Sequence, residues 1–338
     1  MGARFDNRMF ALPTPDYEAC PAFAPYFGKV TKEMRRQALE TFMPALQGRY
    51  IQQQSARQRQ FDVRIGHGDE VLKALQRDGV LLHAIDEDAR SRIRAYVTPM
   101  AEALRARLDA LAKVKFGDIN VPLEPAQHPR LFIDVEAALR DCGALAAFSA
   151  YSGAELGLLR LSLQVNTERE TRLSYGEIDA TGLPGLKTTY FHVDSNDWPT
   201  VKALLYVCDV GEDQGPFRFV RGSHRLMDDF ESAVRKTNDK LRQPREQFLA
   251  LPEEFRQHCH FGDFIDETTP GAAELLANEV VCTDGRSDLA LFDNNGVHRG
   301  GFVRSGHRFM LQCQFWHAER MIERNTGIAA ARAVLQPA

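Results

Sequence analysis

The stretch TTYFHVD, residues 188–194, places a histidine and a carboxylate two positions apart in a run of β-branched and aromatic residues. Such a run predicts a β-strand, in which successive side chains point to opposite faces. His192 and Asp194 would then project from the same face, where an imidazole and a carboxylate can converge on one ion. This triplet alone is weak evidence, because a strand histidine bonded to a neighbouring carboxylate is the simpler alternative.

A second strand-like run, SDLALFD at residues 287–293, is followed by NNGVHRGG at 294–301. The glycines around His298 allow its strand to fold back beside the first one. Two histidines and one carboxylate on one face of an octahedron leave three positions open, which is typical of non-haem Fe(II) sites. The sequence therefore predicts His192, Asp194 and His298 as metal ligands and as the catalytic centre.

A third element, RFMLQCQFW at residues 308–316, alternates polar and apolar side chains. This pattern predicts a strand with a packed apolar face and a polar-lined face that begins at Arg308. A guanidinium in that position suits bidentate capture of a carboxylate. Arg304 is a close competitor, but the glycine at 306 and the strand that follows favour Arg308.

The run LRLSLQVN at residues 159–166 alternates in the same way, with leucines and Val165 on one face. Gln164 and Asn166 lie on the other face and are predicted to contact a bound ligand. The alternative is that this polar face is simply the solvent-facing side of a sheet.

The overall pattern changes near residue 146. Before it, the segment 86–114 has apolar residues at intervals of three or four, as in an amphipathic helix. After it, short β-branched and aromatic runs are bounded by turn residues, which favours an antiparallel sheet pair or barrel over alternating βαβ units. We therefore predict a mainly β fold with flanking helices, of the α+β class.

Three regions are predicted along the chain. Residues 1–70 would form an N-terminal extension packed on the core, 71–320 the main domain, and 321–338 a C-terminal tail. Within the main domain, residues 226–284 form a long polar, helix-prone insertion. A segment of this length inside a β domain is typical of a functional element such as a lid.

The composition points to an ordinary globular protein. The net charge of −4 gives no cationic surface for nucleic acid, and no run approaches the length of apolar chain that spans a bilayer. The six cysteines form no CxxC pair, which argues against a disulfide framework and a thiolate zinc site. We expect a soluble, cytoplasmic protein with a small-molecule substrate and neither nucleic acid nor membrane as partner.

Four motifs occur in an order that resembles the phytanoyl-CoA dioxygenase-like superfamily. They are HVD at 192–194, QGPFRFVRGSHR at 214–225, HRGG at 298–301 and GHR at 306–308. The resemblance covers roughly residues 71–316, while the first 70 residues have no counterpart in it and the insertion before Asp284 is longer than a minimal member needs.

What the resemblance implies is a double-stranded β-helix, or jelly roll, of the cupin type. It implies that His192, Asp194 and His298 bind Fe(II) and that Arg308 binds the co-substrate 2-oxoglutarate. The oxidant would be O₂. The expected reaction is hydroxylation of an unactivated C–H bond in a natural-product, amino-acid or acyl substrate, with release of succinate and CO₂. The retained carboxylate of Asp194 argues against halogenation, for which related enzymes carry a small residue there.

Two other classes remain open from the residues. The chain could be a cupin-fold metal-binding or structural protein, or a metalloenzyme that uses no 2-oxoglutarate, such as a thiol dioxygenase. Neither alternative needs Arg308 behind the metal.

Overall fold

The computed structural model describes residues 70–112, 114–168, 187–194, 201–225, 272–283 and 288–335. Its α-helices are α4 (Glu70–Asp78), α5 (Glu87–Asp109), α6 (Phe116–Ile119), α7 (Pro129–Asp141), α8 (Ala144–Ser152), α13 (Ala272–Leu276), α14 (Ala318–Arg324) and α15 (Gly327–Leu335). Its strands are β1 (Val80–His83), β2 (Asn120–Leu123), β3 (Leu156–Thr167), β4 (Val201–Tyr206), β5 (Phe217–Val220), β6 (Glu279–Cys282), β7 (Leu289–Asp293), β8 (His298–Arg299) and β9 (His307–His317).

Two antiparallel sheets form the centre of the molecule. The larger one has six strands in the order β1-β7-β4-β9-β3-β2, and the smaller one has three in the order β6-β5-β8. Most strand neighbours in the large sheet are far apart in sequence, as in the pairing of β3 with β9 from Leu156↔His317 to Thr167↔His307. Sheets built by such long-range antiparallel pairing, rather than by βαβ units, are those of the predicted double-stranded β-helix.

The large sheet is covered on both faces because its strands alternate between two apolar clusters. On β9, Phe309 and Leu311 pack in the cluster that faces the helices, whereas Met310 packs in the cluster between the two sheets. Strand β4 alternates in the same way, with Leu204 and Tyr206 on the inner side. This is the period of two that the sequence predicted for residues 308–316, and it gives the sheet one helix-covered face and one inner face.

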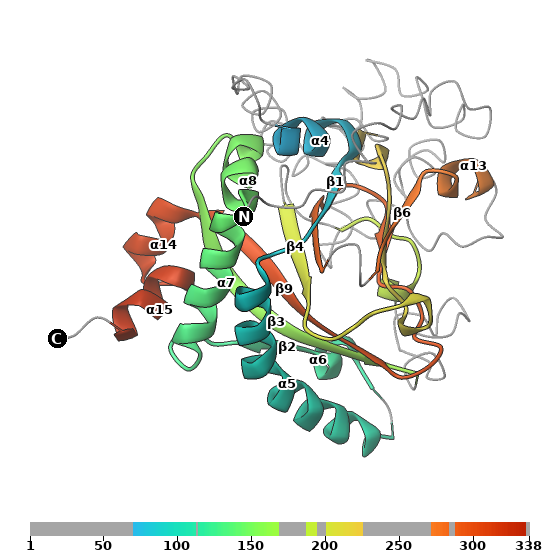
Figure 1. The fold of residues 1–338 in the computed structure, drawn as a ribbon, viewed down its shortest axis with the longest axis horizontal. Helices are drawn as coiled ribbons and strands as arrows, with labels where there is room; N and C mark the ends of the chain where they lie inside the picture. Colours follow the sequence, from blue (N-terminus) through green and yellow to red (C-terminus); the bar gives the residue numbers. More distant parts are fainter. Residues whose placement is uncertain are drawn as a thin grey trace, which may run out of the picture.

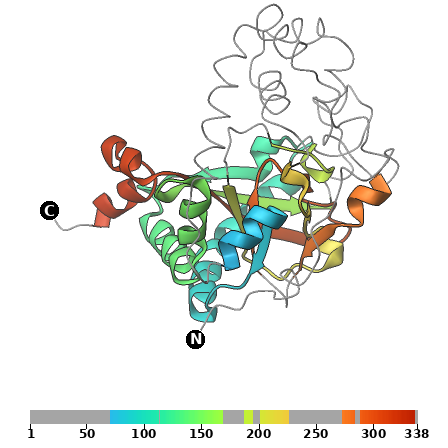
Figure 2. The same ribbon diagram turned by 90° about the horizontal axis from the view of Figure 1, so that it is seen from above.

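Helices α5, α7, α8, α14 and α15 pack against the outer face, where each contacts β3. Figure 1 shows α7, α8, α14 and α15 on one side of the long strands, with β6 and α13 on the other, and Figure 2 shows the same layers from above. Helix α5 begins after Asp86, whose side chain accepts hydrogen bonds from the backbone N–H groups of Asp88 and Ala89. Its buried stripe, which includes Ile93 and Val97, is the one predicted from the spacing of apolar residues.

Several predicted boundaries differ from the structure. The stretch 188–194 is not a continuous strand, because Lys187–Thr189 form a 3₁₀ turn and His192 is joined to His298 by an isolated bridge. Residues 279–282, predicted as part of the helical insertion, form β6 and pair with β5. Residues 226–271 and 1–69 lie outside the described residues, so the predicted insertion and extension stay predictions.

The C-terminal residues 321–335 form most of α14 and all of α15. Met321, Ile328 and Ala331 are buried in the helix-facing cluster, so this segment belongs to the packed domain rather than to a separate tail. Among the described helices, none combines the length and the apolar character that crossing a bilayer requires.

Candidate metal centre

The two predicted histidine ligands are joined directly through their backbones. The N–H of each residue donates to the carbonyl of the other, at 2.9 Å in both directions. A reciprocal pair of this kind brings the side chains of opposite residues close together. The imidazole ring centroids lie 4.4 Å apart, although the two residues are distant in sequence.

Each imidazole is oriented by a carbonyl two residues before it. The Nδ1 of His192 lies 2.9 Å from the carbonyl oxygen of Tyr190, and the Nδ1 of His298 lies 2.8 Å from that of Gly296. Because a carbonyl can only accept, Nδ1 carries a proton in both rings, which leaves Nε2 as the atom available to a metal. This is the arrangement that fixes the tautomer and the ring orientation of histidine ligands in metal sites.

Asp194 completes the group. Its Oδ1 lies 3.7 Å from Nε2 of His192 and its Oδ2 lies 3.8 Å from Nε2 of His298. The three side chains offer ligand atoms that all lie within 4.8 Å of one another. Within the described residues this is the single group of three or more histidine, cysteine or acidic residues that could hold a metal ion.

Burial keeps the site in the charge state that metal binding requires. Burial, and then the neighbouring imidazole of His192, lower the pKa of His298 to about 3, so this ring is neutral at ordinary pH. Burial alone would raise the pKa of Asp194, but the Lys202 ammonium and the two imidazoles outweigh it and hold that pKa well below its ordinary value. A neutral His298 imidazole and an Asp194 carboxylate are therefore available together.

Lys202 is a site residue that the sequence analysis missed. Its Nζ donates to Oδ2 of Asp194 at 2.5 Å, and the lysine and aspartate side chains are 16% and 20% exposed. The alternation of the predicted strand places Lys202 on the same face as Leu204 and Tyr206. The alternation along this strand can be read from the sequence, but no sequence pattern indicates that this face of the strand meets Asp194.

Aromatic rings surround the histidine pair on the inner side. The ring centroids of Phe292, Phe217 and Phe219 lie 5.0, 5.9 and 6.4 Å from that of His298. All three phenylalanines are buried between the two sheets. Their apolar rings keep water away from one side of the centre and lower the local dielectric, which strengthens electrostatic contacts within it.

Arg308 is buried near the strand that carries His298. Arg308 is only 1% exposed, and its Nη1 donates to the carbonyl of Gly300, two residues beyond His298. The competing candidate, Arg304, is exposed. Arg308 is thus buried beside the strand that carries His298, as the sequence-based choice between the two arginines requires, whereas Arg304 is not.

Gln164 and Asn166 lie beside Arg308 on the inner face. Asn166 is directly opposite Arg308 in the pairing of β3 with β9, and Gln164 is opposite Met310. Gln164 donates to Asn166 at 2.8 Å and accepts from Gln312. Gln164 and Asn166 are 3% and 2% exposed, so the alternative that this face is the solvent side of the sheet is wrong.

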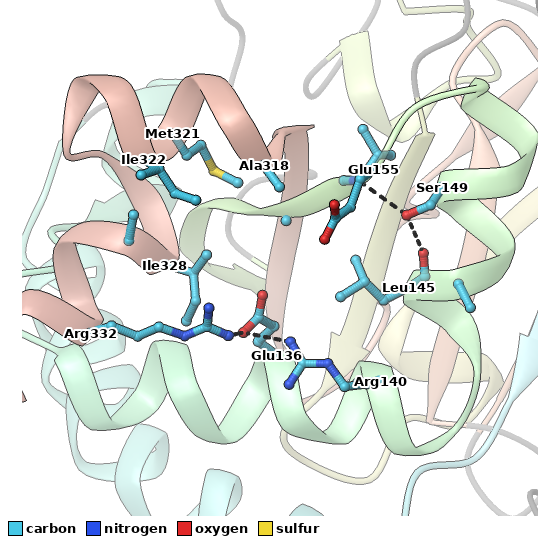
Figure 3. Close-up of a pocket in the computed structure, with 14 residues that line it drawn as sticks. Glu136, Arg140, Leu145, Ser149, Glu155, Ala318, Met321, Ile322, Ile328 and Arg332 are labelled. Atoms are coloured by element: carbon cyan, nitrogen blue, oxygen red, sulfur yellow. Dashed lines mark hydrogen bonds and ion pairs between the residues drawn. The ribbon is translucent and has the colours of Figure 1, made fainter.

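A separate pocket of about 330 Å³ lies on the helical side of the molecule, between α7, α8, α14 and α15 (Figure 3). None of its lining residues belongs to the histidine–aspartate group. Its buried carboxylate, Glu136, pairs with Arg140 at 3.2 Å and with Arg332. That carboxylate is already neutralised within the wall, which is typical of a structural ion pair.

The donor set fits Fe(II). Two imidazole nitrogens and one carboxylate oxygen are the ligands that non-haem iron sites use, and their convergence leaves room for further ligands. The orienting carbonyls of Tyr190 and Gly296 supply the outer contacts that such histidines need. The described cysteines offer no competing thiolate site, because Cys142, Cys208, Cys282 and Cys313 are free and scattered.

Comparison with protein families gives one match. Residues 181–310 match the family model described as phytanoyl-CoA dioxygenase (PhyH), a span that includes the two histidines, Asp194 and Arg308. The family resemblance inferred from the four motifs is confirmed over these residues. The match indicates an oxygenase that uses Fe(II), 2-oxoglutarate and O₂. No curated protein matches the sequence.

Solved structures are similar at a lower level. The 2-oxoglutarate-dependent epimerase SnoN from nogalamycin biosynthesis is 16% identical, with 74% of this chain and 80% of that chain covered and a TM-score of 0.44. EctD from S. alaskensis, solved with 2-oxoglutarate and 5-hydroxyectoine, is 15% identical over 76% and 80%, with a TM-score of 0.45. HygX from Streptomyces hygroscopicus, with nickel and 2-oxoglutarate, is 16% identical over 75% and 88%, with a TM-score of 0.40. Likenesses this distant transfer neither reaction nor substrate to the present chain.

Proposed function

Because residues 181–310 match the phytanoyl-CoA dioxygenase family, we propose that this chain is an Fe(II)- and 2-oxoglutarate-dependent dioxygenase that hydroxylates a small molecule. His192, Asp194 and His298 would hold the iron, and Arg308, with Gln164 and Asn166, would hold the co-substrate. The substrate would be of the natural-product, amino-acid or acyl type, with succinate and CO₂ as the other products.

The observation that carries this proposal is the convergence of three ligand atoms within 4.8 Å. Each histidine presents Nε2 because Nδ1 is held by a backbone carbonyl, so the group is oriented before any ion arrives. An aspartate that only stabilised a charged histidine would need a protonated imidazole. Burial, which lowers the pKa of His298 to about 3, excludes that role for this ring.

Bound Fe(II) would supply the activation of O₂ and the removal of hydrogen from carbon. The residues of this chain do the rest. Arg308 would pair with the distal carboxylate of 2-oxoglutarate, a bidentate contact that also fixes its direction. Phe217, Phe219 and Phe292 exclude water behind the histidines, and the retained carboxylate of Asp194 favours transfer of a hydroxyl group over halogenation.

One spectrum and one product assay test the proposal. The wild-type protein, loaded with Fe(II) and 2-oxoglutarate without oxygen, should show the weak visible absorption band of a chelated complex. With oxygen and a substrate drawn from the three classes, it should release succinate and a product 16 Da heavier. A product 2 Da lighter than the substrate would mean that the protein desaturates or cyclises its substrate and does not hydroxylate it. A product of the same mass as the substrate would indicate epimerisation.

Three variants assign the roles. Asp194→Ala should abolish substrate-dependent succinate release, and turnover near the wild-type rate would remove Asp194 from the site. Arg308→Met should weaken 2-oxoglutarate binding by at least about tenfold, as expected for loss of one buried charged pair, while the exposed Arg304→Met should not. Equal effects of the two arginine variants, or wild-type protein that binds metal but no 2-oxoglutarate, would favour the cupin-like alternative.

A further inference from the structure

Lys202 places its ammonium beside the carboxylate of a predicted metal ligand, where a second cation is unexpected. It projects from the inner face of β4, opposite Phe292 on β7 and Gln314 on β9. Its ammonium donates to Oδ2 of Asp194 at 2.5 Å. Asp194 is the one acid in the group that would hold a divalent cation, so Lys202 places a like charge next to any ion bound there. A positive charge in this position opposes metal binding, and its presence therefore needs a reason other than ion affinity.

The two oxygens of Asp194 are nearly equivalent towards the histidines. Oδ1 lies 3.7 Å from Nε2 of His192, and Oδ2 lies 3.8 Å from Nε2 of His298. Distances to the imidazoles thus do not select which oxygen becomes a ligand, and a carboxylate can bind a metal through one oxygen or both. The lysine removes this symmetry, because it engages Oδ2 and leaves Oδ1 for the ion.

We propose that Lys202 is a positioning residue that holds Oδ2 of Asp194 and limits this carboxylate to one coordination position. The reason is the number of coordination positions that the reaction needs at the ion. The proposed reaction needs two positions for 2-oxoglutarate and one for O₂, and three are open only if each protein ligand takes one. This inference rests on the proposed function, and it assigns to Lys202 the task of keeping the co-substrate position open.

The same ammonium also acts on the co-substrate through charge. 2-Oxoglutarate is a dianion, so a partly buried positive charge beside the ion attracts it while repelling the ion itself. Loss of Lys202 should therefore change the two affinities in opposite directions. Metal binding should tighten because a like charge is removed and both aspartate oxygens become available. Binding of 2-oxoglutarate should weaken because a position is blocked and an attractive charge is lost.

A purely structural lysine would behave differently. If Lys202 only neutralised Asp194 and stabilised the fold, its loss would loosen the site and weaken both affinities. The sign of the change in metal affinity separates the two roles without any measurement of turnover. This matters because a variant with low activity would be compatible with either role.

The experiment uses Lys202→Met and Lys202→Gln in the full-length protein. Titration calorimetry measures the Kd of Mn²⁺ alone and then the Kd of 2-oxoglutarate for the Mn²⁺-loaded protein. We expect Lys202→Met to bind Mn²⁺ about tenfold more tightly and 2-oxoglutarate about tenfold more weakly, the size typical of one outer contact at a metal site. The glutamine variant keeps a donor for Oδ2 without the charge, so its Mn²⁺ affinity should also rise while its loss of 2-oxoglutarate affinity is smaller.

Arg160→Met is the matched control. Arg160 lies on β3 opposite Gln314 of β9, in the same row of the sheet as Lys202, and it is exposed. Its loss removes one positive charge from this row without touching the Asp194 carboxylate, so both Kd values should stay within about twofold, since exposed charges are well screened.

Opposite shifts in a folded Lys202 variant support the proposal. Shifts of both affinities in one direction, or no shift in either, overturn it, and if the methionine variant does not fold, the glutamine variant decides by the same criterion. Wild-type protein that binds neither Mn²⁺ nor 2-oxoglutarate would instead remove the proposed function, and the role of Lys202 with it. Wild-type binding of both with unshifted variants removes only the role of Lys202.

Discussion

Gly300 leaves no room for a side chain beside Arg308. A Cβ built on Gly300 would lie 2.9 Å from Nη2 of Arg308 and 3.4 Å from the carbonyl oxygen of Thr188. Ordinary contacts between such atoms begin near 3.5 Å, so Gly300→Ala should displace the guanidinium by roughly half an ångström. Arg308 is buried, and it cannot avoid this displacement by turning into solvent.

The expected effect follows from that displacement. A misplacement of about 1 Å at a reacting group typically costs about a hundredfold, so half of it should weaken 2-oxoglutarate binding about tenfold, or by about 1.4 kcal/mol. Overpacking should also lower the stability by about 1 kcal/mol. Mn²⁺ affinity should stay within about twofold, since the substitution changes none of the three predicted ligand side chains and the displaced Arg308 is not one of them.

Calorimetry of Mn²⁺ and 2-oxoglutarate binding, together with a thermal melt, provides the assay. Gly117→Ala is the control, because a Cβ at Gly117 would meet nothing within 4 Å. The control should bind both ligands as the wild type does. A folded Gly300→Ala protein with wild-type affinity for 2-oxoglutarate would refute the argument that Gly300 sets the position of Arg308 for co-substrate binding.

Two further predictions concern stability. The pKa of His298 lies at about 3 in the folded protein, below its ordinary 6.5, so between these values the unfolded chain takes up a proton that the folded one does not. The metal-free protein should therefore lose stability as the pH falls from 6.5 towards 3, by roughly 1.4 kcal/mol per pH unit. Urea titrations at several pH values measure this loss. If the free energy of unfolding of His298→Gln changed with pH as steeply as that of the wild type, the prediction would be wrong. Tyr151 donates its hydroxyl to the buried Asp293 carboxylate at 2.6 Å, so Tyr151→Phe should cost about 1–3 kcal/mol. The exposed Tyr96→Phe should stay within about 0.5 kcal/mol by the same denaturation assay, and equal losses would mean that the Asp293 contact contributes nothing.

Local patterns in the sequence were enough for the features that depend on neighbouring residues. The period of two in residues 308–316 predicted which side chains of β9 face the helices and which face the second sheet. Gly79, with φ of 75°, ends α4 before β1, which is the usual place for a glycine after a helix. These features follow from backbone geometry within one element, so a stretch of a few residues contains the information.

Contacts between distant elements required the tertiary structure. Sequence motifs suggested that His298 joins His192 and Asp194, but the reciprocal backbone bonds that set their distance depend on the register of two separate strands. The contact of Lys202 with Asp194 and the burial of Gln164 depend on how the sheets face each other. The amino-acid order determined what each strand presents on its faces. Only the folded chain decided which faces meet, because pairing register and layer packing depend on long-range contacts that no local period encodes.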